Sequence, residues 1–255
     1  MTLDAMFFAF AVPAVLFAAI SKAGFGSGAA FASASILALI LEPAQALGVM
    51  LPLLMLIDVA SLRPYWRKWD WAATKLLILG AVPGILVAIW LYQVANADVF
   101  RFLIGAISLL FVGYQAAGAW GLMKPRQTPL GPVAGFISGI VAGFTSFVSH
   151  AGGPAVAIYM LSQGVSKTTY QATTVIVFWI VNILKFVPYA FLGIFTWNTL
   201  LADLILAPVA LIGTWLGVRA HHMVPERLFF ALTYTLLVVT GSKLIWDSLD
   251  HLWRA

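Results

Sequence analysis

Cysteine is absent from this chain of 255 residues, and charged side chains make up only 9% of it. The absence of cysteine excludes disulfides, thiolate chemistry, cysteine-ligated zinc and cysteine-held iron–sulfur clusters. The low charge content excludes an ordinary soluble domain, in which Asp, Glu, Lys and Arg make up about 25% of the residues. The sequence must therefore be read as that of a protein whose surroundings are largely apolar.

Apolar residues dominate the composition, at 62% of the chain and a mean hydropathy of +1.00. They fall into about ten runs joined by short loops, which predicts an all-α polytopic membrane protein with a single integral membrane domain over residues 1–255. The first run lacks the basic start and cleavage site of a signal peptide, so we expect it in the mature fold. The runs are 5–20, 28–41, 45–62, 73–94, 99–120, 132–149, 154–163, 169–191, 197–219 and 226–248.

The ten runs divide into two sets of five that share landmarks at a constant separation. Gly26 and Gly152 lie 126 residues apart, and so do Gln45 and Gln171. This spacing predicts an internal duplication with repeats of about 5–122 and 131–250. The second run of each set is shorter than the roughly 20 residues that a membrane-spanning helix needs, so we expect a broken or re-entrant helix there.

Loop charges reverse between the two predicted repeats. The loop after the third run is basic, with Arg63, Arg67 and Lys68, whereas its counterpart at 193–197 has no basic residue. The positive-inside rule then places the basic loops in the cytoplasm and both termini outside, and it makes the repeats inverted, as in many transporters. This distribution also explains the net charge of +5 better than nucleic-acid binding would.

Two glycine-rich breaks, half a sequence apart, combine small residues with an ionisable side chain. The first runs from Lys22 to Gly28, and the second runs from Ser146 to Pro154. Interrupted helices expose backbone N–H groups, and their positive ends favour anions. The predicted substrate-binding residues at the breaks are Lys22, Gly24, Gly26, Gly28, Thr145, Ser146, His150, Gly152 and Gly153. The plainer alternative for Lys22 is that it extends its ammonium group to the membrane surface.

Lys185 lies in the middle of an apolar run, far from either end. A charge at bilayer depth costs about 2.5 to 3.5 kcal/mol on insertion scales, so it requires a partner or a function. Asn182, three residues earlier, lies on the same helical face, and both residues are predicted to bind substrate. The alternative is a structural pair with a buried acid, for which Asp58 is the candidate, acting as a gate or as a simple staple.

His150 can exchange a proton near neutral pH, which makes it and Asp58 candidates for coupling or gating. A lone histidine in an apolar protein can equally be a hydrogen-bonded structural residue. The hydroxyls of Thr145 and Ser146 favour the functional alternative, because they can donate to an anion without adding further charge. Protons are accordingly a candidate coupling ion.

The sequence resembles the sulfite exporter TauE/SafE family of bacterial membrane transporters over almost its whole length. The resemblance rests on an ordered set of motifs in both halves, which are Lys22-Ala-Gly-Phe-Gly-Ser-Gly28, Pro43-Ala-Gln-Ala46, Leu51-Pro52, Asp58, Gly143-Phe-Thr-Ser146, His150-Ala-Gly-Gly-Pro154, Tyr159, Thr173-Thr174, Asn182, Lys185, Pro188-Tyr189 and Leu192-Gly193. It implies an exporter of sulfite, sulfonates or related small sulfur-containing anions in the bacterial cytoplasmic (inner) membrane, with no organic cofactor.

These features together predict a carrier that binds a small anion between two inverted halves and works by alternating access. An anion channel and a carrier of small organic carboxylates are the alternatives that use the same polar breaks. A membrane enzyme is disfavoured because no nucleophile and base pair or metal-ligand motif is found, and a purely structural subunit leaves Lys185 and His150 unexplained. The expected partners are the anion and the lipid bilayer, with a homodimer as the candidate assembly.

Overall fold

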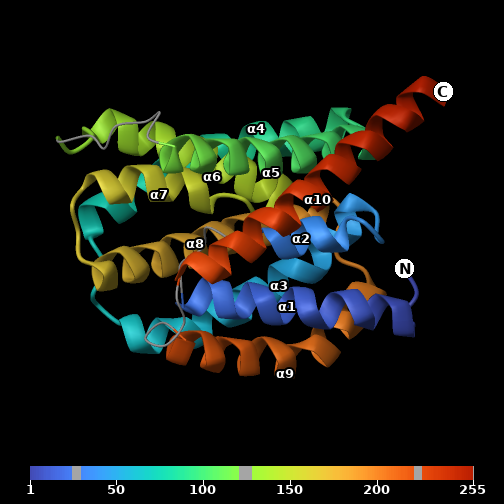
Figure 1. The fold of residues 1–255 in the computed structure, drawn as a ribbon, viewed down its shortest axis with the longest axis horizontal. Coiled ribbons are helices and arrows are strands. Elements are labelled where there is room, and N and C mark those ends of the chain that lie inside the picture. The colour runs from blue at the N-terminus through green and yellow to red at the C-terminus, as the bar shows by residue number, and fades with distance from the viewer. Residues whose placement is uncertain (25–29, 121–127, 221–225, 255) are drawn as a thin grey trace.

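The computed structural model describes residues 1–24, 30–120, 128–220 and 226–254. Within these residues every regular element is a helix, and no strand occurs (Figure 1). The helices are α1 (Ala5–Gly24), α2 (Ala32–Leu37), α3 (Pro43–Tyr65), α4 (Trp71–Val94), α5 (Ala97–Ala119), α6 (Pro132–Ser149), α7 (Gly153–Ser162), α8 (Lys167–Phe191), α9 (Trp197–Ala220) and α10 (Glu226–Arg254).

Seven helices in the described part of the chain, namely α1, α3, α4, α5, α6, α8 and α9, are long and apolar enough to cross a membrane. Several helices begin at a side-chain cap, because Asp70, Asn96 and Ser166 each accept a hydrogen bond from the backbone N–H three residues later. Large apolar side chains such as Leu86 and Leu110 are exposed on the outer surface of the bundle, as lipid contact requires. The predicted all-α polytopic membrane fold is confirmed.

The short helices α2 and α7 each fold back beside the long helix that precedes them. Met1, before α1, and Leu41, after α2, line the same surface pocket, so this segment enters and leaves at one face. At the end of α7, the Ser162 hydroxyl accepts a hydrogen bond of 3.2 Å from the backbone N–H of Leu130, just before α6. Neither short helix therefore crosses the bundle, as the sequence predicted for re-entrant segments.

The two hairpins, α1–α2 and α6–α7, enter from opposite faces. Helix α3 starts at the face where α2 ends and runs across the bundle (Figure 1). Just beyond its far end, the Asp70 backbone N–H donates a hydrogen bond of 2.9 Å to Thr173, in the first two turns of α8. Because α8 directly follows α7, this is the face of the second hairpin. The arrangement has the form that inverted repeats would give, although the sequence duplication itself stays a prediction.

Within the described residues, glycines bring three pairs of helices into backbone contact, which are α4 with α6, α9 with α1 and α5 with α10. A Cβ atom on Gly80 or Gly84 of α4 would collide with the backbone of α6 around Phe136 and Ile140. In the same way, a Cβ on Gly217 of α9 would lie 2.7 Å from the Ile20 carbonyl oxygen of α1. Small residues four positions apart permit such close packing of helices in lipid. Each pair therefore joins a helix of the first five to one of the second five.

Helices α3 and α8 form the buried centre of the bundle and run antiparallel. Tyr65 at the end of α3 packs against Ala172 and Val175 near the start of α8. Further along, the Asn182 amide of α8 donates a hydrogen bond of 2.8 Å to Asp58 of α3. Lys22, near the end of α1, and His150, at the turn between α6 and α7, both contact α3, which positions the candidate site.

Candidate functional site

Lys22 is buried inside the bundle, with 4% of its surface exposed, so it does not extend to the membrane surface. It lies in the last turn of α1, and its Nζ is 2.7 Å from Oδ1 of Asp58, which is fully buried in α3. The suggested pairing of Asp58 with Lys185 is therefore wrong, because the direct ionic partner is Lys22. The sequence could not reveal this choice, since it depends on how the α1 tip packs against α3.

Asp58 has a second partner on the opposite side of the site. Its Oδ2 accepts the hydrogen bond of the Asn182 amide, and the Lys22 ammonium also lies 3.5 Å from the Leu54 carbonyl oxygen. A buried carboxylate needs such partners, because desolvation strongly disfavours an uncompensated charge. Asp58 thus ties α1, α3 and α8 together at one depth.

The second break begins where α6 ends. His150 adopts a left-handed backbone conformation with φ of 56°, which stops the helix and allows α7 to start at Gly153. The conformation turns the chain sharply and directs the imidazole into the bundle, where its Nε2 lies 3.3 Å from the Leu47 carbonyl oxygen of α3. The break therefore projects an ionisable side chain into the protein interior, as the sequence predicted.

Lys185 is fully buried, and its Nζ reaches three acceptors at the end of α6. These are the Ser146 carbonyl oxygen at 3.0 Å, the Ser146 hydroxyl at 2.9 Å and Nδ1 of His150 at 2.9 Å. Three acceptors match the three N–H donors of an ammonium group. If Nδ1 accepts from this ammonium, the ring proton resides on Nε2 and is donated to the Leu47 carbonyl, so the imidazole is neutral.

A small internal cavity separates the two lysine clusters. Its volume is about 10 Å³, which is close to the minimum for a single water molecule. The structure therefore represents a closed site, in which internal partners occupy the groups that an anion would contact. The lining residues are Lys22, Ala30, Leu54, Ser146, His150, Phe178 and Asn182.

The remaining predicted site residues lie around the cavity without lining it. The single O–H of Thr145 lies 2.7 Å from the Val141 carbonyl oxygen and 3.1 Å from the Ala151 carbonyl oxygen, so its hydrogen bond stabilises the turn. A Cβ on Gly152 would lie 2.7 Å from the Phe178 ring, so this glycine allows the hairpin tip to approach α8. Gly153 is the buried first residue of α7.

The glycines of the first break give a different picture. Gly24 packs against α9, where a Cβ would lie 2.5 Å from the Gly217 carbonyl oxygen, so the described structure gives it a role in helix contact. Gly26 and Gly28 lie outside the described residues. Substrate contact by the backbone of this segment stays a prediction.

Three polar residues around the site were not selected from the sequence as site residues. The Gln171 amide donates to the Lys22 carbonyl oxygen at 2.8 Å, and the Tyr65 hydroxyl donates to the Ala23 carbonyl oxygen at 3.1 Å. The fully buried Tyr189 hydroxyl donates to the Phe147 carbonyl oxygen at 2.5 Å. All three satisfy carbonyl groups at interrupted helix ends, a requirement that follows from the breaks even though the donor cannot be chosen from the sequence.

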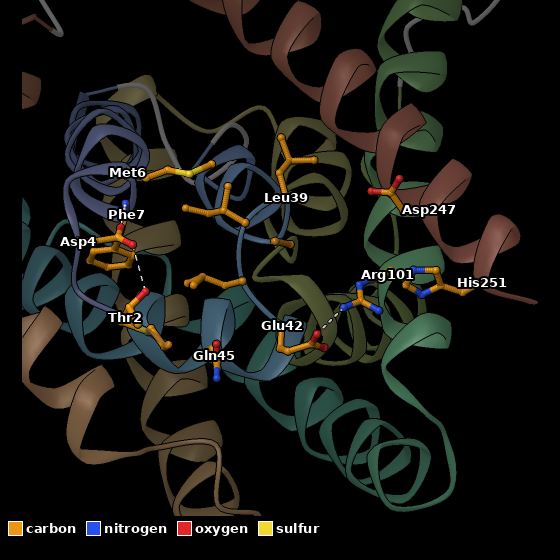
Figure 2. Close-up of a pocket in the computed structure, with 14 residues that line it drawn as sticks. Thr2, Asp4, Met6, Phe7, Leu39, Glu42, Gln45, Arg101, Asp247 and His251 are labelled. Carbon is orange, nitrogen blue, oxygen red and sulfur yellow. Dashed lines mark hydrogen bonds and ion pairs between the residues drawn. The ribbon is translucent and has the colours of Figure 1, made fainter.

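A larger pocket of about 640 Å³ opens at the face that holds the N-terminus (Figure 2). Arg101 crosses it, with ion pairs of 2.7 Å to Glu42 and to Asp98. Asp4 lies at another edge, where a hydrogen bond from the Phe7 backbone N–H lowers the pKa of its carboxyl group. Among the described side chains that line this pocket, the acids Asp4, Glu42 and Asp247 therefore outnumber the cation Arg101.

Comparison with curated proteins and with solved structures gives no match. A family model does match, and it is that of the sulfite exporter TauE/SafE, over residues 11–244. The match spans both hairpins and every polar residue of the closed site. With its seven membrane-length helices in the described residues, the protein is a multi-pass membrane protein, consistent with the inner membrane. The chain belongs to the sulfite exporter TauE/SafE family of membrane transporters.

Proposed function

We propose that the chain is a secondary transporter that exports sulfite, a sulfonate or a related small sulfur-containing anion by alternating access. The observation that carries this proposal is the position of two buried lysines, Lys22 and Lys185, where hairpins from opposite faces meet. Buried cations at such a position are the natural counter-charges for an anion inside a membrane protein. The family match supports transport as the activity class.

In this proposal the anion replaces internal partners of the lysines. It would take up contacts with Lys22, Lys185 and the Ser146 hydroxyl, while the His150 imidazole and the Asn182 amide act as further donors. Because the cavity holds about one water molecule in the closed state, the side chains that line it must move apart before an anion can enter. The lost internal hydrogen bonds are then replaced by hydrogen bonds to oxygens of the anion.

The pocket at the N-terminal face supplies the outer part of the route. Ala38, at the end of α2, lines this pocket, whereas Ala30, just before α2, lines the closed cavity. Helix α2 therefore lies between the two spaces, and its movement would connect them. While α2 is displaced and the site is open to this face, the opposite face must stay closed, as alternating access requires.

Protons and a second subunit are proposed as the further partners. His150 and Asp58 are the candidate proton-coupling or gating groups, because each contacts a lysine that an anion would engage. A homodimer is the candidate assembly. Sulfite efflux that is independent of an imposed pH gradient would reject proton coupling, and a monomeric mass in native mass spectrometry would reject the dimer.

The proposed function is tested by flux of radiolabelled sulfite in proteoliposomes. Saturable exchange is expected for the wild type and is expected to be lost in Lys185→Ala. Lys243→Ala is the matched control, because Lys243 is an exposed lysine that pairs with Asp247 on the surface of α10. Normal exchange by folded Lys185→Ala would reject the assigned site, and absence of exchange in every variant would reject sulfite as substrate.

Flux kinetics distinguish the proposed carrier from an anion channel. A channel would conduct without saturation and without counterflow, whereas a carrier accelerates uptake when unlabelled substrate is present inside. The same vesicles, loaded with small carboxylates in place of sulfite, test the remaining alternative of a carboxylate carrier.

A further inference from the structure

The geometry of the closed site fixes its net charge. The Lys22 ammonium lies 2.7 Å from the Asp58 carboxylate, so these two charges cancel. Lys185 has three hydrogen-bonding neighbours, and when its ammonium donates one N–H to each of them, Nδ1 of a neutral His150 is one of the acceptors. One positive charge is therefore left over at the meeting point of the two hairpins.

Charges elsewhere in the described bundle do not alter this balance. The charged groups that act on Asp58 are Lys22 and Lys185, and those that act on His150 are the same two lysines. The nearest tyrosines, Tyr65 and Tyr189, are neutral phenols that donate hydrogen bonds to backbone carbonyl groups. Because the site is buried, its charges are screened far less than charges at the surface.

A second buried acid lies far enough away to serve as a reference. Asp203 of α9 is buried, and one of its carboxyl oxygens has no hydrogen-bond partner among the residues that the structure describes. Gly217 of α9 is level with Lys22, because it packs against Ile20 and Ala23 of α1. Asp203 precedes Gly217 by fourteen residues, or about 21 Å of helix. A substitution at Asp203 therefore leaves the charge of the site unchanged.

We propose that this site selects a monovalent anion and that Asp58 sets this valence. The inference rests on the proposed function and narrows its substrate to the monoanionic form of a sulfur oxyanion, which is hydrogen sulfite or a sulfonate. A monoanion neutralises the single excess charge of the site. A dianion leaves one uncompensated negative charge beside Asp58, in surroundings where an unpaired charge is strongly unfavourable.

Two probes of fixed valence test the preference directly. Methanesulfonate is a monoanion at any pH near neutrality, and sulfate is a dianion. We expect wild-type protein in proteoliposomes to exchange methanesulfonate with a kcat/KM at least about tenfold above that for sulfate, a modest ratio for one uncompensated charge near a buried carboxylate. Equal kcat/KM values for the two probes would overturn the valence assignment and leave an anion carrier in place.

Sulfite supplies an independent readout, because its second ionisation lies near neutral pH. The apparent KM for total sulfite should rise as the pH is raised and the monoanion is depleted. The KM calculated for hydrogen sulfite alone should stay constant. Methanesulfonate controls for titration of the protein, since its own charge does not change. A KM for total sulfite that is flat over this range would overturn the proposal.

Changing Asp58 should change the preferred valence. Asp58→Asn raises the net charge of the site by one, so the ratio of sulfate to methanesulfonate exchange should increase at least about tenfold. A double variant, Lys22→Gln with Asp58→Asn, restores the original net charge and should restore the preference for the monoanion. The control Asp203→Asn removes a distant buried acid and should leave the ratio unchanged.

The ratio separates electrostatic selection from a structural defect. Damage to the fold lowers exchange of both probes together, whereas the proposed role changes one relative to the other. If Asp58→Asn does not fold, the double variant and the sulfite pH series still test whether the site prefers a monovalent anion. A folded Asp58→Asn with the wild-type ratio would overturn the role of Asp58, while loss of all exchange in the wild type would instead reject the proposed function.

Discussion

Removal of the Lys22 charge is the sharpest test of how the closed site is held together. Lys22→Met keeps a long, unbranched side chain of similar length but removes the ammonium that lies 2.7 Å from Asp58. Among the described residues, Asn182 would then be the direct partner left to that carboxylate. We expect a folded but markedly less stable protein, because a buried acid loses the charge that compensates it.

The expected magnitude follows from the distance and the burial. Two unit charges 2.7 Å apart attract by about 6 kcal/mol at an effective dielectric constant of about 20. Desolvation of both groups offsets much of this attraction, so the pair as a whole contributes little net stability. Removal of one partner leaves the other charge buried without compensation, which lowers the free energy of unfolding by about 3 to 5 kcal/mol.

The measurement is the free energy of unfolding in mixed micelles, followed by tryptophan fluorescence during titration with SDS. Lys22→Met should lose about 3 to 5 kcal/mol. The double variant Lys22→Met with Asp58→Leu should recover most of this loss, because no unpaired charge remains. The reasoning is refuted if Lys22→Met is as stable as the wild type, or if the two substitutions are simply additive.

Three further outcomes follow from the same structure. Tyr189→Phe should lose about 1 to 3 kcal/mol of unfolding free energy in the SDS titration, since the Phe147 carbonyl oxygen is left without its donor. Asp4 has a lowered pKa, because it accepts a hydrogen bond from the backbone N–H three residues on, so it stabilises α1 above the pKa of an unfolded aspartate, about 4. That contribution is lost as the pH falls through the lower pKa of the folded state. Asp4→Asn should therefore reduce the fall in melting temperature that the wild type shows in this acidic range. Cysteine pairs introduced across the α4–α6 contact should form disulfides without loss of sulfite exchange, whereas pairs across the α3–α8 contact should block exchange when oxidised.

The helical framework could be predicted from the sequence because lipid imposes strict rules. Each long apolar run must satisfy its own backbone hydrogen bonds, which leaves the helix as the one available form for a run without sheet partners. The break at His150 was also predictable, because Gly152, Gly153 and Pro154 stop one helix and start another. The depth of Lys185 could be inferred from its place in the middle of a run.

The partners of these residues could not be predicted in the same way. From the sequence, either Lys22 or Lys185 could pair with the buried acid Asp58. The packing of the end of α1 against α3 decides that Asp58 pairs with Lys22. Thr145 looked like an anion donor but bonds to carbonyl oxygens at 2.7 and 3.1 Å, which is a common use of a hydroxyl in a membrane helix. The partner of each of these side chains depends on how the helices pack against one another, and the spacing of residues along one helix does not determine that packing.

A missed signal in the sequence bears directly on how the site opens. Gly80 and Gly84 are four residues apart, as are Gly213 and Gly217, and these pairs mark the backbone contacts of α4 with α6 and of α9 with α1. Backbones in such close contact cannot slide past each other without collision, so each helix pair is expected to move as one body. The bodies that rock against each other would then mix helices from both halves of the sequence. The Asp58–Asn182 hydrogen bond joins α3 to α8 through side chains, so we expect the boundary between the moving bodies to lie there. An anion that draws Lys22 and Lys185 away from their internal partners would loosen this boundary at the place where movement must begin.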